Sequence, residues 1–196
     1  MDVAPRAAGS ADLDGFVETL TASFLDDPVM SWAFPDRDVR ARRLRVLWRY
    51  VAGGIYLPAG RCTTLPAHDA VAMWREPGAA PADAFWAEHG EAFATELEGD
   101  LERMSLLSET MAAHHPTDAH WYLLALGTRP DAQGRGLGSV LLAHTLAVAD
   151  EQGQPAYLEA TSPRSRALYA RFGFDVVDEL TPPGGPPLWA MWRTPT

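Results

Sequence analysis

The first third of the chain alternates apolar and polar positions with helical periodicity. The spacing predicts one helix that runs to about Phe24, with Ser10 or Asp12 as its N-cap, and a second over Val39–Ala52, with Asp36 as its N-cap. The apolar side chains of the second helix share one face, and its arginines lie mainly on the other. That apolar face consists of Leu44, Leu47, Trp48 and Val51. We therefore expect two helices that each pack against a core along one side.

The apolar pattern then shortens to strand length. Gly53-Gly54 is expected to open a sheet. The strands predicted after it are Ile55–Leu57, Arg61–Leu65 and Asp69–Trp74. The longer stretch Phe85–Ala113 predicts one long helix or two short helices, with Gly99 as the break.

The second half of the chain alternates strand and helix patterns. Trp121–Leu126 is almost continuously apolar, which is typical of a central strand covered on both faces. Leu137–Asp150 carries a wide apolar face, and Gly153 with Pro155 ends the predicted helix. The elements predicted after it are a strand at Ala156–Ala160, a helix over 162–172, a strand through Val176 and Val177, and a last strand at Leu188–Arg193. The order is strand, loop, helix, strand, helix, strand.

A glycine-rich loop, Gln133–Ser139, joins the first of these strands to the first helix. Glycines at Gly134, Gly136 and Gly138 leave backbone N–H groups uncovered where the helix begins. Those donors and the positive end of the helix dipole favour an anion such as a phosphate or pyrophosphate. We therefore expect a phosphate-bearing ligand at this loop.

Two common phosphate-binding motifs do not fit the loop. A P-loop needs a lysine that reaches the outer phosphates, and the chain contains no lysine. A dinucleotide fingerprint needs a third glycine where the chain has Ser139 or Leu141. A third pattern, Q-x-x-G-x-G, is matched by Gln133, Gly136 and Gly138, with an ordinary glycine-rich turn as the alternative.

The Q-x-x-G-x-G pattern resembles the acetyl-CoA pyrophosphate loop of the GNAT superfamily of N-acyltransferases. The other segments that match the family are Gly127-Thr128-Arg129-Pro130, Leu158-Glu159 and Leu168-Tyr169-Ala170-Arg171-Phe172-Gly173-Phe174. Further segments resemble the puromycin N-acetyltransferase branch. They are Phe24 to Pro28, Val71 to Trp74, His115-Pro116 and Pro163-Arg164.

The resemblance implies a mixed α/β fold. A central, twisted, mostly antiparallel sheet of about six to seven strands would carry helices on both faces. The whole chain, 1–196, would form one domain, with the acetyl-CoA-binding core at about 121–177. The helical region at about 10–52 would lie on the acceptor side.

The resemblance also implies how acetyl-CoA would be held. Strand residues would run beside the pantetheine arm, and a bulge near Gly127 would turn a backbone N–H toward the thioester oxygen. The residues expected to contact acetyl-CoA are Leu126, Gly127, Thr128, Gln133, Gly134, Arg135, Gly136, Leu137, Gly138, Ser139 and Arg164. Many family members have asparagine where this chain has Ser162. Arg164 is the candidate replacement for the side-chain contact to CoA that the asparagine makes in the family.

Two side chains are candidates for the chemistry. By resemblance, Tyr169 would lie near the sulfur and act as general acid, since a phenol is protonated at neutral pH. The alternative is an aromatic residue that only packs. Glu159 is a carboxylate inside an apolar strand, and would take the amine proton directly or through water, or bind the ammonium. An outward-facing position is its alternative.

The acceptor site is expected between the first helices and the sheet face. The candidates are Asp27, Trp32, Phe34 and Trp74, together with Glu159. Trp32 and Trp74 fit a core equally well. His115 is a candidate base or an ordinary loop histidine.

Composition limits the remaining choices. The 196 residues are 47% hydrophobic and 21% charged, and the formal net charge is −10. An acidic chain does not favour nucleic acid; its charge either favours a cationic acceptor or only keeps the protein in solution. The single cysteine, Cys62, excludes an internal disulfide or a zinc cluster, and no metal is expected. With neither a membrane-spanning run nor a secretory signal visible, a cytoplasmic protein without a membrane partner is expected.

The predicted activity is acetyl transfer from acetyl-CoA to a primary amine of a small molecule, by direct attack of the neutral amine. An aminonucleoside or another antibiotic is a candidate acceptor, with detoxification or self-resistance as the role. One alternative is a protein or peptide acceptor. Another is a non-catalytic acyl-CoA-binding regulatory module. A monomer or a homodimer is expected.

Overall fold

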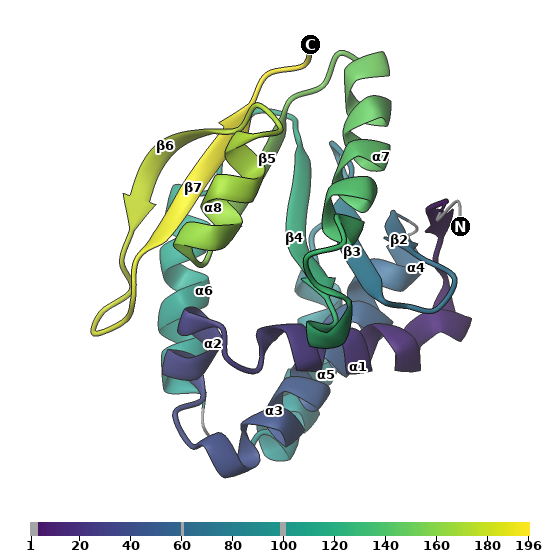
Figure 1. Cartoon of the computed structure of the whole chain (residues 1–196). Coiled ribbons are helices and arrows are strands. Elements are labelled where there is room, and N and C mark those ends of the chain that lie inside the picture. Colours follow the sequence, from purple (N-terminus) through teal and green to yellow (C-terminus); the bar gives the residue numbers. More distant parts are fainter. Residues whose placement is uncertain (1–3, 60, 99–100) are drawn as a thin grey trace.

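A computed structural model describes residues 4–59, 61–98 and 101–196. Its centre is a seven-stranded sheet in the order β1-β2-β3-β4-β5-β7-β6 (Figure 1). The strands are β1 (Arg6–Ala7), β2 (Cys62–Thr64), β3 (Ala70–Arg75), β4 (Trp121–Thr128), β5 (Ala156–Ala160), β6 (Asp175–Leu180) and β7 (Leu188–Arg193). Every neighbouring pair is antiparallel except β4 and β5. The predicted mixed α/β fold with a mostly antiparallel sheet is confirmed.

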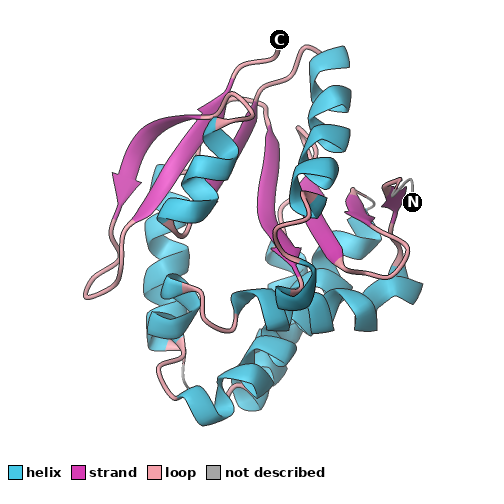
Figure 2. Ribbon diagram, in the orientation of Figure 1, coloured by secondary structure: helices cyan, strands magenta, loops and turns pink. Residues whose placement is uncertain are grey.

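Helices cover both faces of the sheet (Figure 2). The helices are α1 (Leu13–Phe24), α2 (Pro28–Ala33), α3 (Arg37–Tyr50), α4 (Leu57–Ala59), α5 (Asp83–Glu96), α6 (Glu102–His114), α7 (Leu137–Glu151) and α8 (Pro163–Ala170). Helix α7 is the crossover that a parallel β4–β5 pair requires. Among the described helices, none is long and apolar enough to cross a membrane.

Two apolar cores lie on the two faces. On one face, α7 and α8 bury side chains against Trp74, Trp121 and Leu158. On the other face, α1 and α3 bury theirs against Val71 and Tyr157. Because β4 contributes side chains to both cores, its nearly continuous apolar run is explained.

One predicted strand is wrong. Residues near Ile55–Leu57, expected to begin the sheet, belong to a π-helical turn, Val51–Tyr56, and to α4. The two glycines before them allow close packing instead of opening a sheet. A Cβ at Gly54 would lie 2.0 Å from the Phe85 ring of α5, and one at Gly53 would lie 3.1 Å from Leu13. Glycine is therefore required at these two positions by contacts between helices, which the local sequence pattern does not reveal.

The remaining boundaries are mostly as predicted. Asp36 caps α3 by accepting a hydrogen bond from the Asp38 backbone N–H, although the helix begins at Arg37 and not Val39. The Phe85–Ala113 stretch forms two helices, α5 and α6, and Gly99 lies outside the described residues. Strand β1, helix α2 and the short helix α4 were not predicted from the sequence pattern.

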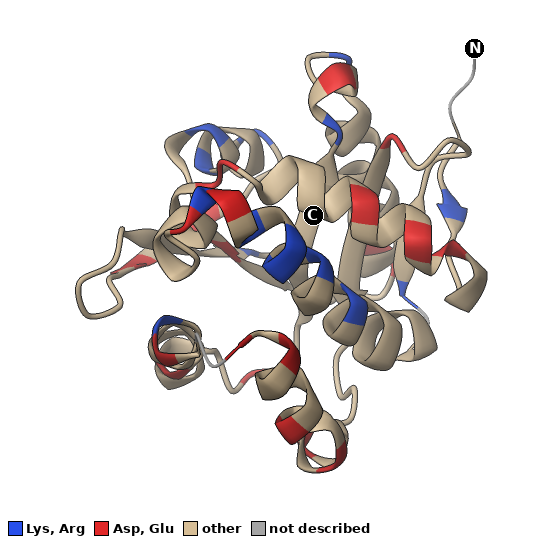
Figure 3. Ribbon diagram, turned by 90° about the horizontal axis from the view of Figure 1, so that it is seen from below, with Lys and Arg blue, Asp and Glu red and all other residues tan. Residues whose placement is uncertain are grey.

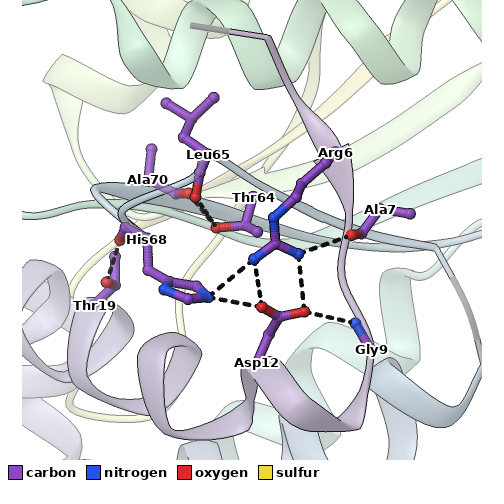
Figure 4. A network of polar contacts seen from close by, with 9 residues as sticks. All are labelled: Arg6, Ala7, Gly9, Asp12, Thr19, Thr64, Leu65, His68 and Ala70. Carbon is purple, nitrogen blue, oxygen red and sulfur yellow. Dashed lines mark hydrogen bonds and ion pairs between the residues drawn. The ribbon is translucent and has the colours of Figure 1, made fainter.

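Asp12 is the N-cap residue of α1, as one of the two predicted candidates, but its side chain makes no capping hydrogen bond to the helix. Its carboxylate pairs with the Arg6 guanidinium, accepts from the Gly9 N–H at 3.0 Å and lies 2.8 Å from His68 Nε2 (Figure 4). The Arg6 hydrogen bond lowers the pKa of Asp12 well below its usual range. This network fastens the two-residue edge strand β1 to the β2–β3 turn.

The arginines of α3 form a solvated, paired surface. Arg45 contacts Glu18 at 2.9 Å and Arg49 contacts Asp14 at 3.0 Å, both on α1. Seen from below, positive and negative segments lie close together on the helices (Figure 3). Exposed pairs of this kind contribute about 0–1 kcal/mol each. Arg40 differs, because it is buried and donates to the backbone oxygens of Leu25, Phe34 and Pro35.

Candidate functional site

A cleft opens where β4 and β5 separate. Their pairing runs from Trp121 and Ala156 to Leu123 and Leu158 and ends there. Beyond that point lies a cleft of about 710 Å³. Its lining includes residues of three regions: Leu123, Leu124, Ala125, Leu126 and Thr128 from β4, Glu159 and Thr161 from β5 and its end, and Asp26, Asp27 and Pro28 from the α1–α2 connection and the start of α2. The split in the sheet therefore brings the central strands and the N-terminal helices to one hollow.

The irregularity in β4 lies at Leu124, not near Gly127. Met73 pairs with Ala125 and Trp74 pairs with Leu123, so Leu124 is an extra residue on its strand. Gly127 keeps regular pairing with Val71. It is needed for a different reason, since a Cβ there would lie 2.5 Å from Ser23 Oγ and 3.1 Å from Leu20 of α1. The predicted bulge exists but is displaced, because the glycine serves packing between helix and sheet.

The glycine loop has the conformation that its sequence requires. Gly134 and Gly136 have φ of 78° and 77°, a left-handed region that favours glycine. Gly136 is the N-cap of α7, no side chain among the described residues makes a capping hydrogen bond there, and a Cβ at Gly134 or Gly136 would meet no atom within 4 Å. The N–H groups at the start of a long helix therefore face open space, which suits a phosphate.

Gln133 fastens the loop on both sides. Its Nε2 donates to the Thr128 carbonyl at 3.2 Å, and its Oε1 accepts from Arg164 Nη1 at 3.0 Å. Arg164 and Arg171 line the cleft and place positive charge near the loop. Arg135 is exposed and is absent from the lining of the cleft. The other predicted loop residues all line it.

Helix α8 carries Tyr169 to the cleft. Ser162 and Ser165 form a reciprocal cap at its start: each hydroxyl accepts from the other's backbone N–H at 3.1 Å. Tyr169 is 8% exposed, and burial, followed by the charge of Asp27, raises its pKa above the ordinary value. Its hydroxyl is therefore a protonated donor at neutral pH.

Asp27 holds the acceptor-side connection in place. Its Oδ1 accepts from the Val29 and Met30 N–H groups at 2.9 and 3.1 Å and so caps α2. Its Oδ2 accepts from the Thr161 hydroxyl just beyond β5. Burial raises the pKa of Asp27 despite these bonds.

Glu159 lines the same cleft, and its side chain is 3% exposed. The Tyr122 hydroxyl donates to its Oε2 at 2.9 Å. Its Oε1 is buried and has no hydrogen-bond partner among the described residues. A buried carboxylate oxygen without a donor is costly, so this atom is a natural contact for a ligand N–H. Burial, followed by the charge of Glu159, raises the pKa of Tyr122 well above its ordinary value.

Three predicted acceptor residues lie outside the cleft lining. Phe34 and Trp74 are 0% exposed and belong to the two cores, with Trp74 packed edge-on to Trp121. Trp32 contacts the guanidinium of Arg103 from α6, 5.9 Å from its ring centroid. Of the five predicted acceptor residues, Asp27 and Glu159 therefore reach the cleft. The three aromatic residues were candidates because of their residue type alone. Their side chains pack elsewhere in the structure and do not reach the cleft.

Sequence reasoning did not select several polar residues at or beside the cleft. Thr161 and Arg171 line it, and Tyr122 orients Glu159. Tyr122 on β4 pairs with Tyr157 on the parallel strand β5. Tyr157 lies two positions before Glu159, so the two side chains point to the same side of β5. No signal in the sequence gives the register of two parallel strands, so this contact could not be predicted. Arg171 lies inside the Leu168–Phe174 segment that matches the family, and could have been included.

This cleft combines a split sheet, a phosphate-type loop and a buried carboxylate. Such a combination is typical of an acyl-CoA-dependent acyltransferase. A family model, the acetyltransferase (GNAT) family, matches residues 63–174. That is more than half of the chain, which therefore belongs to the GNAT acetyltransferases, a family that uses acetyl-CoA. The protein is an N-acetyltransferase of this type.

Relatives and solved structures agree with this family assignment. An uncharacterized N-acetyltransferase of Schizosaccharomyces pombe is 23% identical over 189 residues, covering 88% of this chain and 74% of the relative. A crystal structure described as histone acetyltransferase HPA2 and related acetyltransferase, from Corynebacterium glutamicum, has 29% identity, a TM-score of 0.71 and coverage of 100% and 98%. A polyamine N-acetyltransferase of Drosophila melanogaster shares the fold at 16% identity, with a TM-score of 0.63 and coverage of 98% and 100%.

Proposed function

We propose that this enzyme transfers the acetyl group of acetyl-CoA to the primary amine of a small, cationic molecule in the cleft between β4 and β5. The observation that carries the proposal is Oε1 of Glu159. It is buried, has no hydrogen-bond partner among the described residues, and belongs to a side chain that lines the same cleft as the glycine loop.

The acetyl-CoA side of the cleft is the better defined. The N–H groups of Gly134, Gly136 and Gly138 and the start of α7 would bind the pyrophosphate, with Arg164 beside them. The splayed part of β4, including Leu126 and Thr128, would run beside the pantetheine arm. The extra residue at Leu124 offers an irregular backbone position from which an N–H can reach the thioester oxygen. One such donor typically contributes about 10²–10³ in rate.

Glu159 and Tyr169 would divide the proton chemistry. The incoming amine must be neutral to attack, and Glu159 Oε1 can accept its proton. Tyr169, which keeps its proton because its pKa is raised, can donate to the departing thiolate. The nitrogen attacks the thioester carbon directly and the C–S bond breaks. The second nitrogen proton replaces the one that Tyr169 gives to the sulfur, and no covalent enzyme intermediate is formed.

The charge of the cleft favours a cationic acceptor. Asp27 and Glu159 both line it, and among the described side chains no arginine pairs with either. The fold is shared with agmatine, polyamine and arylalkylamine N-acetyltransferases. An aminonucleoside or similar antibiotic, which the puromycin-type segments favour, is a narrower candidate acceptor. A protein amine is the second candidate function, favoured by the whole-chain similarity to the structure described as a histone acetyltransferase.

The test is release of CoA thiol from acetyl-CoA across a panel of acceptors: agmatine, spermidine, a phenethylamine, puromycin and a short lysine peptide. We expect acceptor-dependent release with at least one small cationic amine. Loss of rate in Glu159→Gln, with acetyl-CoA affinity retained, would support the assigned base. Release with the peptide alone would favour the second candidate, and binding of acetyl-CoA without release by any amine would contradict the proposal.

A further inference from the structure

Glu159 lies between two separate openings of the molecule. The first is the cleft that Glu159 itself lines. The second is a smaller hollow of about 210 Å³ at the ends of β3 and α6 and the beginning of β4. Its lining is polar and contains Arg75, Glu76, His115, Asp118, His120 and Tyr122. Tyr122 and His115 are therefore the side chains that connect Glu159 with the second opening.

The contacts around the carboxylate are unequal. Oε2 is taken by the Tyr122 hydroxyl at 2.9 Å, which fixes the orientation of the carboxylate. Oε1 lies 3.9 Å from His115 Nδ1. Such a separation closes to hydrogen-bond length with a movement of about 1 Å, and catalytic hydrogen bonds are often long before substrate binds. The Glu159 side chain is 3% exposed and the His115 side chain is 35% exposed. The imidazole therefore reaches water in the second hollow, whose lining does not include Glu159.

The proposed reaction requires one proton to leave the enzyme in every turnover. An ammonium acceptor loses two protons when it becomes an amide: one ends on the CoA sulfur and the other is released. Acetyl-CoA and the acceptor together would fill the cleft and separate Glu159 from the solvent on that side. The released proton then needs another way out.

We propose that His115 carries this proton from Glu159 to water in the second hollow. The neutral imidazole accepts the proton from Oε1 on Nδ1 and becomes an imidazolium. It then loses the Nε2 proton to water in the hollow, and exchange between the two tautomers through that water restores the starting form. His115 acts through Glu159 and touches neither the acceptor nor the thioester. This inference rests on the proposed function, because it needs Glu159 as the base.

Ring contacts hold His115 in this position. Its ring meets Tyr122 edge-on at 4.7 Å and Tyr157 edge-on at 5.1 Å, and lies 5.0 Å from His120. Burial lowers the pKa of His120, whose Nδ1 lies 2.6 Å from the Asp118 carbonyl and so is engaged elsewhere. The titratable and charged groups that surround His115 are Glu159, Tyr122, Tyr157, His120, Asp118, Arg75 and Glu76. Of the two histidines, His115 is the one with a ring nitrogen recorded within 4 Å of Glu159.

The test compares His115→Phe with His114→Phe. Phenylalanine keeps the ring contacts of His115 and removes its proton transfer. His114 is the matched control, because its Nδ1 lies 2.8 Å from the Thr110 carbonyl of its own helix. We expect His115→Phe to lower kcat about tenfold to a hundredfold, with the KM for acetyl-CoA unchanged. His115→Ala, which leaves space for a free ring, should lose a similar factor and regain kcat in proportion to added imidazole. His114→Phe should keep the wild-type kcat and show no response to imidazole.

The outcomes separate the relay from the activity on which it rests. If the wild type transfers acetyl and Glu159→Gln is impaired, but His115→Phe turns over at the wild-type rate, the relay alone is overturned. A slow His115→Ala variant that imidazole does not rescue also overturns it, since the loss is then structural. His115→Asn, measured in parallel, gives the same decision if the phenylalanine variant does not fold. If no amine is acetylated by the wild type, the proposed function and the relay fail together.

Discussion

Asp27 of the α1–α2 connection accepts a hydrogen bond from the Thr161 hydroxyl, 134 positions further along the chain. Both residues line the cleft, and the bond joins the N-terminal helical layer to the end of β5. The other oxygen of the same carboxylate caps α2. One side chain therefore sets the position of α2 relative to the strand that carries Glu159.

The two roles of Asp27 are separable by substitution. Asp27→Asn keeps an N-cap acceptor and removes the charge, so we expect little change in Tm but a several-fold higher KM for a cationic acceptor. Asp27→Ala also removes the cap and should cost about 0.5–2 kcal/mol of stability. Asp36→Asn, at the cap of α3 and outside the cleft lining, should change neither the Tm nor the KM for the acceptor. An equal KM for wild type and Asp27→Asn would show that the charge plays no part in acceptor binding.

Glu159→Gln should lower kcat about 10²–10⁴-fold, the usual contribution of general acid–base catalysis. The amide still accepts from Tyr122, so the structure and the Kd for acetyl-CoA should be retained. Steady-state kinetics and calorimetry measure the two effects separately. Glu151→Gln, at the end of α7, is the control and should behave as wild type. A Glu159→Gln enzyme with full kcat would remove this residue from the mechanism.

Gly136→Ala and Gly153→Ala form a matched pair at the two ends of α7. Both positions have positive φ, 77° and 62°, and at both a Cβ would meet no atom within 4 Å. Each substitution should cost about 1–2 kcal/mol in backbone strain, measured by thermal or denaturant unfolding. Gly136→Ala alone should also raise the KM for acetyl-CoA, because its methyl group would stand where the phosphate approaches. Equal values of this KM in the two variants would contradict the assignment of the loop.

The Arg193–Asp150 pair predicts a pH-dependent contribution to stability. The Arg193 hydrogen bonds lower the pKa of Asp150 to about 2, and the two contacts measure 2.7 Å. Because the folded pKa lies below the unfolded value of about 3.9, the contribution is fully present above pH 4 and is lost as pH falls toward 2. Asp150→Asn should therefore be less stable by about 2 kcal/mol at pH 7 and approach wild type near pH 2, in unfolding curves measured across that range. A constant difference at every pH would indicate that the charge of Asp150 is not responsible.

Local sequence determined the elements that depend on short-range chemistry. Asp36 caps α3, the left-handed glycines shape the loop at Gly134–Gly136, and the apolar runs at Trp121 and Leu137 begin a strand and a helix as predicted. The same motifs identified the GNAT family, which the family model confirms. Each of these features is written in neighbouring residues, because capping, turn conformation and amphipathic spacing act within a few positions.

Which candidates share a site depends on the packing of distant segments. Trp74 and Phe34 lie in the cores and not in the cleft. Gly54 packs against the Phe85 ring, and the β4 bulge lies at Leu124 and not near Gly127. The partners of Glu159, namely Tyr122 and His115, follow from the register of two parallel strands and from the end of α6. The loop, the base candidate and the family could all be predicted from local sequence. The position of each side chain around that base depended on packing between segments far apart in the chain, which no local pattern encodes.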